Sequence, residues 1–243
     1  MAQALNDFEG VLLIDKPTGI TSHDVVDRVR RKLKMKRVGH AGTLDPLATG
    51  LLIILVGKAT KLSSRLMSLD KEYEGTVEFG KTSNSYDIDG EIVDTREVPD
   101  SITAEMIQEQ MSTFVGDQYQ TPPMFSAVKI KGVPLYKHAR KGKEVPREPR
   151  FIRVSKYALN SWNSPLGEFY VYCTKGTYIR SLVHDVGQKL GCGGMLVQLR
   201  RIASNNLSIQ DAVTLEDFEN EPLSEISKFL IPGYKALAPG AEV

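Results

Sequence analysis

Two continuous apolar runs constrain the fold of this chain most. The stretch "VLLID" occupies residues 11–15 and "LLIILVG" occupies residues 51–57. A short apolar run without polar alternation is typical of a buried strand, and both runs are far too short to cross a membrane. Pro17 and Gly19 end the first run, as turn residues do at strand ends. The chain is therefore expected to build its core on a sheet.

Further helices and strands are expected in no regular order along the chain. In residues 21–33, Thr21 and Asp24 have the spacing of a capping box ahead of an apolar stripe. Further helices are expected at 103–114 and 177–190, and further strands at 73–80, 125–130, 151–159 and 168–173. The predicted inward faces of the three helices are Val25, Val26, Val29 and Leu33; Met106, Ile107, Met111 and Phe114; and Ile179, Leu182, Val183 and Val186. This mixture predicts an α+β fold on a largely antiparallel sheet flanked by helices.

Charge is distributed unevenly along the chain, although the net charge is only +1. Residues 28–37 hold seven Lys or Arg, and residues 128–153 hold nine basic residues and two acids. Residues 70–111 hold twelve acids and three bases, and residues 211–243 hold seven acids and two bases. Two basic blocks indicate either an anionic partner or simply a solvated helix face and a solvated loop. The composition becomes acidic near residue 212. This change predicts a domain over residues 1–212 and a short acidic segment over residues 213–243.

Several classes of protein are disfavoured by the sequence. The two cysteines, Cys173 and Cys192, form no C-x-x-C pair, which argues against a disulfide framework or a thiolate metal site. The first residues lack the basic and apolar regions of a signal peptide, so a cytoplasmic location is expected. The chain has no phosphate-binding or dinucleotide-binding glycine motif and no paired histidine spacing. We therefore expect no cofactor and no metal.

The stretch "GHAGTLDPLATG" (39–50) sets one acid, Asp45, directly before the second apolar run. The following Pro46 biases Asp45 toward an extended conformation, and three glycines permit a tight backbone path. An acid held at the rim of a buried strand suits a nucleophile or a general base. A simple Asp turn explains the same residues.

The stretch "KGTYIRS" (175–181) is a second candidate for chemistry. Thr177 is expected to cap the helix that follows, and Arg180 lies beside its apolar stripe. A partly buried arginine needs a carboxylate partner. Asp45 is one candidate, which the pairing would keep ionised, and another acid or the solvent are the alternatives. His184 and Asp185 point in different directions and are interpreted as structural.

The stretch 122–150 interleaves aromatic and basic side chains. Phe125, Tyr136 and His138 alternate there with Lys129, Lys131, Lys137, Arg140, Lys141 and Lys143. Basic residues with aromatics at this density suit single-stranded or looped RNA. In the strand at 73–80, Tyr73 is either a platform for a stacked base or an ordinary core residue.

Taken in order, five stretches resemble the motifs of the bacterial TruB family, the tRNA pseudouridine synthases of the T loop. They are "LLIDKPTGITSHDVV", "GHAGTLDPLATGLLIILVGKATK", "KEYEGTVEFG", "PPMFSAVKIKGVPLYKHARKG" and "KGTYIRSLVHDVG". The resemblance runs from about residue 8 to about residue 210. It implies the pseudouridine synthase fold and isomerisation, without cofactor or metal, of the T-loop uridine at position fifty-five.

The resemblance also implies a role for individual residues. Asp45 matches the catalytic aspartate, and attack on the sugar, attack on the base and removal of a sugar proton all remain open for it. The target base must first be flipped out of its stack. The other positions carried over are Tyr73, stacked on the uracil; Arg180, paired with Asp45; Tyr178 and Leu199, lining the pocket; His40, filling space in the T loop; Lys61, near the site; and Lys16 and Pro17, supporting the fold. Residues 122–150 would clamp the RNA, with Lys129, Lys131, Arg140, Lys141 and Lys143 as contacts.

Two departures from the family pattern qualify these expectations. Ser83, Asn84 and Ser85 stand where the family often has Thr-Asp-Thr, so an acid is missing at Asn84. The residues after 212 are too few for the PUA RNA-binding domain of many relatives. The expected partner is the T arm of tRNA, bound by a monomer, with a tRNA-folding chaperone role beside catalysis. The alternatives are a non-catalytic RNA-binding or chaperone protein, and a synthase that acts on another RNA.

Overall fold

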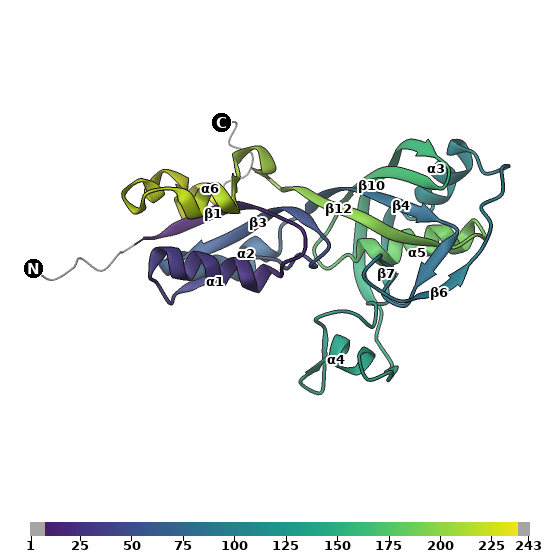
Figure 1. Cartoon of the computed structure of the whole chain (residues 1–243), viewed down its shortest axis with the longest axis horizontal. Coiled ribbons are helices and arrows are strands. Elements are labelled where there is room, and N and C mark those ends of the chain that lie inside the picture. The colour runs from purple at the N-terminus through teal and green to yellow at the C-terminus, as the bar shows by residue number, and fades with distance from the viewer. Residues whose placement is uncertain (1–7, 238–243) are drawn as a thin grey trace, which may run out of the picture. The chain divides into compact units, whose positions relative to one another are not determined.

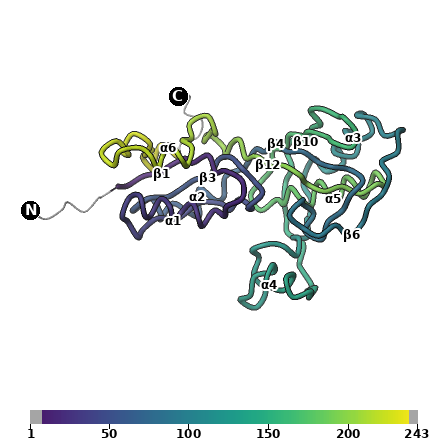
Figure 2. Tube along the Cα trace, viewed as in Figure 1, coloured from purple at the N-terminus to yellow at the C-terminus, as the bar shows by residue number. Residues whose placement is uncertain are grey.

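The computed structural model describes residues 8–237, which divide into two compact units. Of the described residues, 8–73 and 199–237 form unit 1, and 74–198 form unit 2. The chain passes from one unit to the other within two strands, β4 (Lys71–Phe79) and β12 (Gly194–Ser204). The colours in Figure 2 follow this path, with the purple and the yellow parts of the tube both in unit 1. Unit 1 is therefore built from two separate stretches of sequence.

The sheet of unit 1 centres on β1 (Gly10–Lys16) and β3 (Thr49–Val56), which pair antiparallel. Both predicted apolar strands are confirmed, except that Gly57 already belongs to the following 3₁₀ helix. Four further strands pair with these two. With β1 pair β14 (Val213–Thr214, parallel) and β15 (Leu230–Ile231, antiparallel), and with β3 pair β2 (Val38–His40, antiparallel) and the end of β12 (parallel). Residues 213–237 thus flank β1 within unit 1, while the predicted boundary near residue 212 stays a prediction.

Burial on both faces explains why these two strands are continuously apolar. The side chains of β1 and β3 from Val11 to Ile14 and from Leu51 to Val56 are all buried. One core cluster of unit 1 consists of Val11, Leu13, Ala41, Leu51, Ile53, Leu55, Ala59, Leu66, Leu207 and Ala236. The shorter elements of unit 1 are η1 (Gly57–Leu62), α2 (Ser63–Met67), β13 (Leu207–Ser208), η2 (Ile209–Asp211), η3 (Leu223–Phe229) and α7 (Gly233–Ala236).

Helix α1 (Ser22–Leu33) begins where the capping box predicts. The Thr21 hydroxyl accepts from the backbone N–H of Asp24 at 3.1 Å, and the Asp24 carboxylate accepts from the N–H of Thr21 at 2.8 Å. These bonds satisfy two amide groups that a helix start leaves without partners. The four predicted inward residues of α1 are all buried. Helix α6 (Leu215–Asn220) is bonded to α1 through Glu219. The carboxylate of Glu219 accepts a hydrogen bond from Arg28, and its backbone carbonyl accepts one from Lys32.

Unit 2 holds a sheet whose strands follow the order β12, β4, β11 (Leu166–Cys173), β10 (Arg150–Asn163) and β7 (Gly116–Gln120). The β10–β11 and β7–β10 pairings are antiparallel. Helices α3 (Ala104–Ser112) and α5 (Ile179–Lys189) bury apolar faces. Two short hairpins and a helix complete the unit: β5 (Lys81–Ser83) with β6 (Ile92–Thr95), β8 (Lys129–Ile130) with β9 (Val133–Pro134), and α4 (Leu135–Ala139). The predicted α+β class with a largely antiparallel sheet is confirmed.

Three local predictions for unit 2 are wrong. Met106 is 43% exposed, because Ile107 and Met111, four residues apart, already fill the inward face of the short helix α3. The strand expected at 125–130 is reduced to β8, since the carbonyls of Ser126 and Val128 accept bonds from residues entering α4. Thr177 does not cap α5; its hydroxyl donates to Thr174 O at 2.9 Å, and the N-cap is Tyr178.

Candidate active site

Asp45 lies in the loop that joins β2 to β3 in unit 1, and its side chain is half-buried. The loop ends at Gly50, which has a φ of +97° and lies opposite Arg201 in the parallel pairing of β3 with β12. A Cβ on residue 50 would lie 2.3 Å from Arg201 O, so only glycine fits there. The position of this glycine explains how the chain turns sharply from Asp45 into the buried strand.

The buried ammonium group of Lys16 ties the loop to the turn after β1. Lys16 is fully buried, and its Nζ donates to the carbonyls of Pro17 at 2.9 Å, Ile20 at 2.8 Å and Pro46 at 3.3 Å. Burial lowers the pKa of Lys16 to about 8, against the opposing effect of the Asp45 and Asp24 carboxylates. The predicted structural role of Lys16 is thus confirmed, and it places a positive group in the electrostatic surroundings of Asp45.

Two further contacts fix the backbone on either side of Asp45. The Ser22 hydroxyl accepts from Leu44 N–H at 2.9 Å and donates to Leu44 O at 3.1 Å. The N–H of Gly19 donates to Pro46 O at 2.9 Å. Both residues that border Asp45 are therefore held through their main chain, and the acid has little freedom to move with the loop.

Arg201 on β12 contacts the Asp45 loop, and the sequence analysis did not single it out. It is 1% exposed, and it donates from Nε to Leu51 O at 2.7 Å and from Nη2 to Gly42 O at 3.2 Å. Arg201 thus bridges the two ends of the Asp45 loop. Its neighbour Arg200 forms a bidentate ion pair with the carboxylate of Asp15, with N–O distances of 3.0 and 2.6 Å. The sequence "LRR" at 199–201 was a usable signal, because two adjacent arginines on a strand that alternates faces cannot both be solvated.

His40, at the end of β2, is half-buried, with no hydrogen-bond partner for its buried Nδ1 among the residues described. Burial, with the positive Arg201 and His23 nearby, lowers the pKa of His40. A neutral imidazole is therefore favoured at this position. Lys61 is exposed on η1. Leu199 is 9% exposed on β12, and Tyr73 is half-buried on β4.

Arg180 is the central charged residue of unit 2. It is 4% exposed, and its Nη1 lies 3.3 Å from the carboxylate of Asp87, which is equally buried. It also donates to Ser85 O and to Phe125 O, both at 2.8 Å. One of the alternatives for Arg180, a pairing with an acid other than Asp45, is thus present. Because Arg180 and Asp45 belong to different units, their predicted pairing stays a prediction.

The loop that carries Asp87 also explains the departure at Asn84. The Asn84 side-chain oxygen accepts from the N–H of Glu91 at 3.2 Å, so this residue closes the turn between β5 and β6. The buried acid of the loop is Asp87, and the Ser85 hydroxyl donates to it at 2.5 Å. Asp87 was not among the site residues expected from the sequence.

Tyr178 precedes α5, and the side-chain amide of Gln120 holds its backbone. The Gln120 Oε1 accepts from Tyr178 N–H at 2.8 Å, and its Nε2 donates to Tyr178 O at 3.1 Å. Gln120 is 7% exposed at the end of β7. This amide therefore fixes the backbone two residues before Arg180.

The segment 122–150 forms a small lobe of unit 2, which Figure 1 shows around α4. Lys131 and Gly132 both have positive φ, of 49° and 81°, as a two-residue hairpin turn between β8 and β9 requires. The Nη1 of Arg147 donates to Pro122 O at 3.2 Å and so joins the two ends of the segment. All five predicted RNA contacts are exposed: Lys129, Lys131, Arg140, Lys141 and Lys143.

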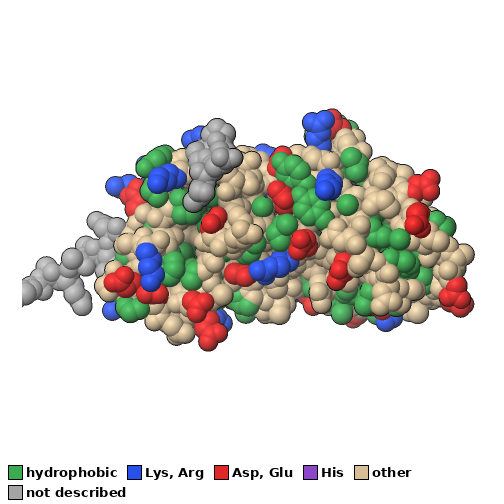
Figure 3. All heavy atoms as spheres, turned by 90° about the horizontal axis from the view of Figure 1, so that it is seen from above, with side chains coloured by type: hydrophobic (Ala, Val, Ile, Leu, Met, Phe, Trp, Pro, Cys, Tyr) green, Lys and Arg blue, Asp and Glu red, His purple; other side chains and the backbone are tan. Residues whose placement is uncertain are grey.

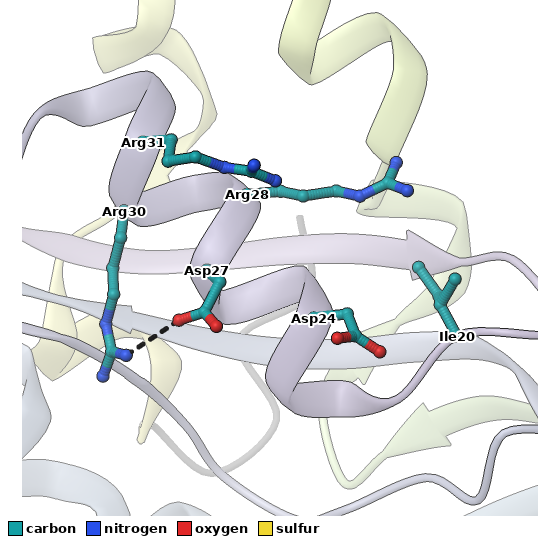
Figure 4. A pocket seen from close by; sticks show the side chains of 6 residues that line it. All are labelled: Ile20, Asp24, Asp27, Arg28, Arg30 and Arg31. Carbon is teal, nitrogen blue, oxygen red and sulfur yellow. Dashed lines mark hydrogen bonds and ion pairs between the residues drawn. The ribbon is translucent and has the colours of Figure 1, made fainter.

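The basic helix α1 borders a hollow of about 580 Å³, which Figure 4 shows in close-up. Its lining residues are Ile20, Asp24, Asp27, Arg28, Arg30 and Arg31. Asp24 is used by the capping box, and Asp27 accepts from Arg30 at 2.9 Å. Arg28 lies 3.5 Å from Glu219, so most of the lining charges already have partners and the hollow does not indicate a small-molecule site. Figure 3 shows the same interspersion of acidic and basic side chains over one face of the protein.

Residues 8–237 show neither a cluster of metal ligands nor a membrane-spanning helix. In this part of the chain, no group of three or more His, Cys, Asp or Glu side chains is placed to hold a metal ion. Nor does any helix there have the length and apolar character needed to span a membrane.

Family comparisons match nearly the whole chain. The profile described as TruB family pseudouridylate synthase (N terminal domain) matches residues 30–179, and that of the tRNA pseudouridylate synthase B C-terminal domain matches residues 180–237. A tRNA pseudouridine synthase B of Opitutus terrae is 59% identical over 97% of this chain and 98% of its own length. That of Aquifex aeolicus is 47% identical over 87% of this chain and 74% of its own.

Two solved structures of similar fold are chains of larger complexes. A chain in a Cbf5–Nop10–Gar1 complex is 29% identical, with a TM-score of 0.72 over 96% of this chain. A chain in an H/ACA RNP bound to a substrate RNA containing 2'-deoxyuridine is 26% identical, with a TM-score of 0.69. This protein spans 62% and 61% of those two chains, less than two thirds of either.

Proposed function

We propose, since this chain belongs to the TruB family of pseudouridylate synthases, that it isomerises the T-loop uridine of tRNA at position fifty-five. The family and its relatives make the chain a tRNA pseudouridine synthase, an isomerase. The choice of this uridine, and Asp45 as the essential group, are the parts that we add. In the reaction, the bond from N1 of uracil to C1′ of ribose breaks and a bond from C5 to C1′ forms. C5 loses a proton and N1 gains one, so the product has the composition of the substrate.

The observation that carries the proposal is the fixed position of Asp45. Its loop is bonded through the main chain on both sides, by Ser22 at Leu44 and by Lys16 and Gly19 at Pro46. An Asp turn needs no such bracing from a fully buried lysine, whereas a reacting carboxylate must keep its position while the uracil turns.

The residues of unit 2 support the same proposal. Arg180, held by Asp87 and two carbonyls, would present a guanidinium of fixed orientation to the reacting carboxylate or to the RNA. Tyr73 would stack on the flipped uracil, with Tyr178 and Leu199 lining its pocket and His40 filling space that flipped bases leave. The exposed cations of segment 122–150, with Lys61, would contact the phosphates. These assignments, the monomeric state and the chaperone role remain proposals.

The test replaces Asp45 by Asn in the full chain. We expect pseudouridine formation on an unmodified T-arm stem-loop to fall below detection, while the affinity for the RNA stays within about threefold, because the amide keeps the shape of the carboxyl group. Tritium release from C5-labelled uridine measures turnover, and fluorescence anisotropy measures binding. The matched control is Asp27→Asn on the surface of α1. Near-normal turnover by Asp45→Asn would refute the assignment of Asp45 as the catalytic residue. Loss of RNA binding by the same variant would mean that the substitution disturbs the loop.

A further inference from the structure

An exposed aromatic pair lies where the basic segment leaves the sheet of unit 2. Tyr119 on β7 is 73% exposed and Phe151 on β10 is 59% exposed. The two residues are direct cross-strand neighbours, with ring centroids 5.9 Å apart and ring planes at 76°. Each lies one residue inside the strand end from which the segment departs, beside β7 in Figure 1. The pair therefore marks the base of the basic segment.

Alternation along the two strands explains why these rings point outward. On the opposite face of β10, Ile152 is 1% exposed and Val154 is fully buried. The next outward pair along the strands is Arg153 with Asp117, whose side chains form an exposed ion pair at 3.0 Å. In the strand order of this sheet, β7 comes last, so the rings lie on its edge. Two large aromatic side chains at one exposed edge are unusual without a partner.

The charge around the pair points to an anionic partner. Arg150, at the start of β10, is exposed, and Arg153 follows Phe151 by two residues. Lys175 is exposed as well, and it directly follows Thr174, whose N–H donates to Arg153 O at 2.9 Å. The exposed Arg150 directly precedes Phe151, whereas the charge of Arg153 is already paired with Asp117. Residues 128–153 as a whole carry nine basic residues against two acids.

Exposed rings among cations match the two faces that RNA offers. An unpaired base presents a flat apolar face that stacks on an aromatic ring, and its phosphate accepts from Arg or Lys. We propose that Tyr119 and Phe151 form an auxiliary platform, separate from the pocket of the flipped uridine, on which one unpaired base of the substrate tRNA stacks. This inference rests on the proposed function, because it takes tRNA as the substrate. It adds a contact that neither the catalytic residues nor the exposed lysines supply.

The aromatic pair has two alternative roles, and each predicts a different experimental result. A cross-strand aromatic pair stabilises its two strands, and that role requires no RNA. An exposed edge strand also pairs readily with a second copy of the chain. The stabilising role predicts a lower melting temperature without a specific loss of RNA affinity. The self-association role predicts a dimer that the same substitutions dissociate.

The experiment replaces both rings by threonine, which keeps a high strand propensity. We expect Tyr119→Thr with Phe151→Thr to weaken binding of an unmodified tRNA transcript roughly fivefold to a hundredfold, as for one lost stacking contact. The slope of log affinity against log salt should not change, since stacking releases no counterions. Turnover at saturating RNA should stay normal. Tyr234→Thr is the matched control, because Tyr234 is 74% exposed in unit 1.

A second variant keeps the test independent of stability. With Phe151→Trp, stacking is retained, so affinity should persist and the introduced indole should be quenched by RNA, beyond any change at Trp162. Unchanged affinity of the double variant for tRNA, an unquenched indole, or a dimer dissociated by the substitutions would each overturn the proposal. Loss of affinity for the isolated T arm would assign the base to that arm, and loss for whole tRNA alone would assign it elsewhere. Normal turnover by Asp45→Asn would instead refute the proposed function and leave this binding result standing.

Discussion

Replacing Asp87 by Ala tests the buried ion pair of unit 2. Asp87 and Arg180 are each 4% exposed, and the charged atoms lie 3.3 Å apart. Removing one member of a buried pair destabilises a protein by about 3–5 kcal/mol, whereas losing a hydrogen bond to a charged group costs about 1.5–3 kcal/mol. Arg180 keeps its bonds to Ser85 O and Phe125 O, so we expect a loss of about 3 kcal/mol.

The single tryptophan offers an assay that is local to unit 2. Trp162 packs edge-on against Phe79, and its Nε1 donates to Ile102 O at 3.3 Å. Its fluorescence during urea unfolding therefore reports on this unit. A double-mutant cycle with Arg180→Met should give a coupling energy of about 1–3 kcal/mol, because the methionine removes the buried charge that Asp87→Ala leaves behind.

An exposed ion pair in the same unit gives the matched control. Asp94 lies 2.8 Å from Arg96, with side chains that are 40% and 46% exposed, so Asp94→Ala should cost less than about 1 kcal/mol. The reasoning is refuted if Asp87→Ala costs no more than this control, or if the effects of Asp87→Ala and Arg180→Met simply add. The first result would mean that the pair is hydrated, and the second that the two charges do not interact.

Three further outcomes are expected. Tyr73→Ala should weaken RNA binding by about 1–3 kcal/mol, while Tyr73→Phe should not; equal losses in filter binding would exclude stacking as its main contribution. Lys141→Ala with Lys143→Ala should make the salt dependence of RNA affinity shallower by up to about two phosphate contacts, and an unchanged slope would remove this loop from the RNA surface. Burial raises the pKa of Asp185 from 3.8 to about 6, so its carboxyl group lowers stability as the pH rises through this range. Asp185→Asn should therefore raise stability above pH 6 by about 2 kcal/mol after a discount for partial exposure, and a gain in thermal melts that persists at pH 3 would contradict this cause.

The sequence predicted best those features whose causes are local. The capping box at Thr21 and Asp24 uses atoms three residues apart, so the start of α1 follows from the sequence alone. The two apolar runs became β1 and β3 because continuous apolarity suits a strand that is covered on both faces. The exposure of the five RNA-contact candidates followed from charge density in the same way.

The features that the sequence did not predict depend on contacts between distant residues. The bridge from Arg201 to Gly42 O and Leu51 O joins residues about 150 positions apart. The adjacent arginines at 200 and 201 indicate that one of them is buried, but they do not say which carbonyl groups it reaches. The sequence offers Asp45 or another acid as the partner of Arg180, because it does not say which of many acids a buried guanidinium reaches. The structure adds Asp87 as one partner, while the pairing with Asp45 stays a prediction. Both cases concern electrostatic partners that are distant in sequence.

The division of unit 1 between the two ends of the chain has a consequence for its synthesis. A ribosome delivers β1 and β3 early, but the strands that complete their sheet, β12, β14 and β15, emerge only after all of unit 2. During that interval the bare edge of β1 is available to other chains, since unpaired strand edges promote aggregation. Unit 2, which is continuous in sequence, can reach its fold first. Closing unit 1 then becomes the last and slowest step, because its strands are separated by more than a hundred residues.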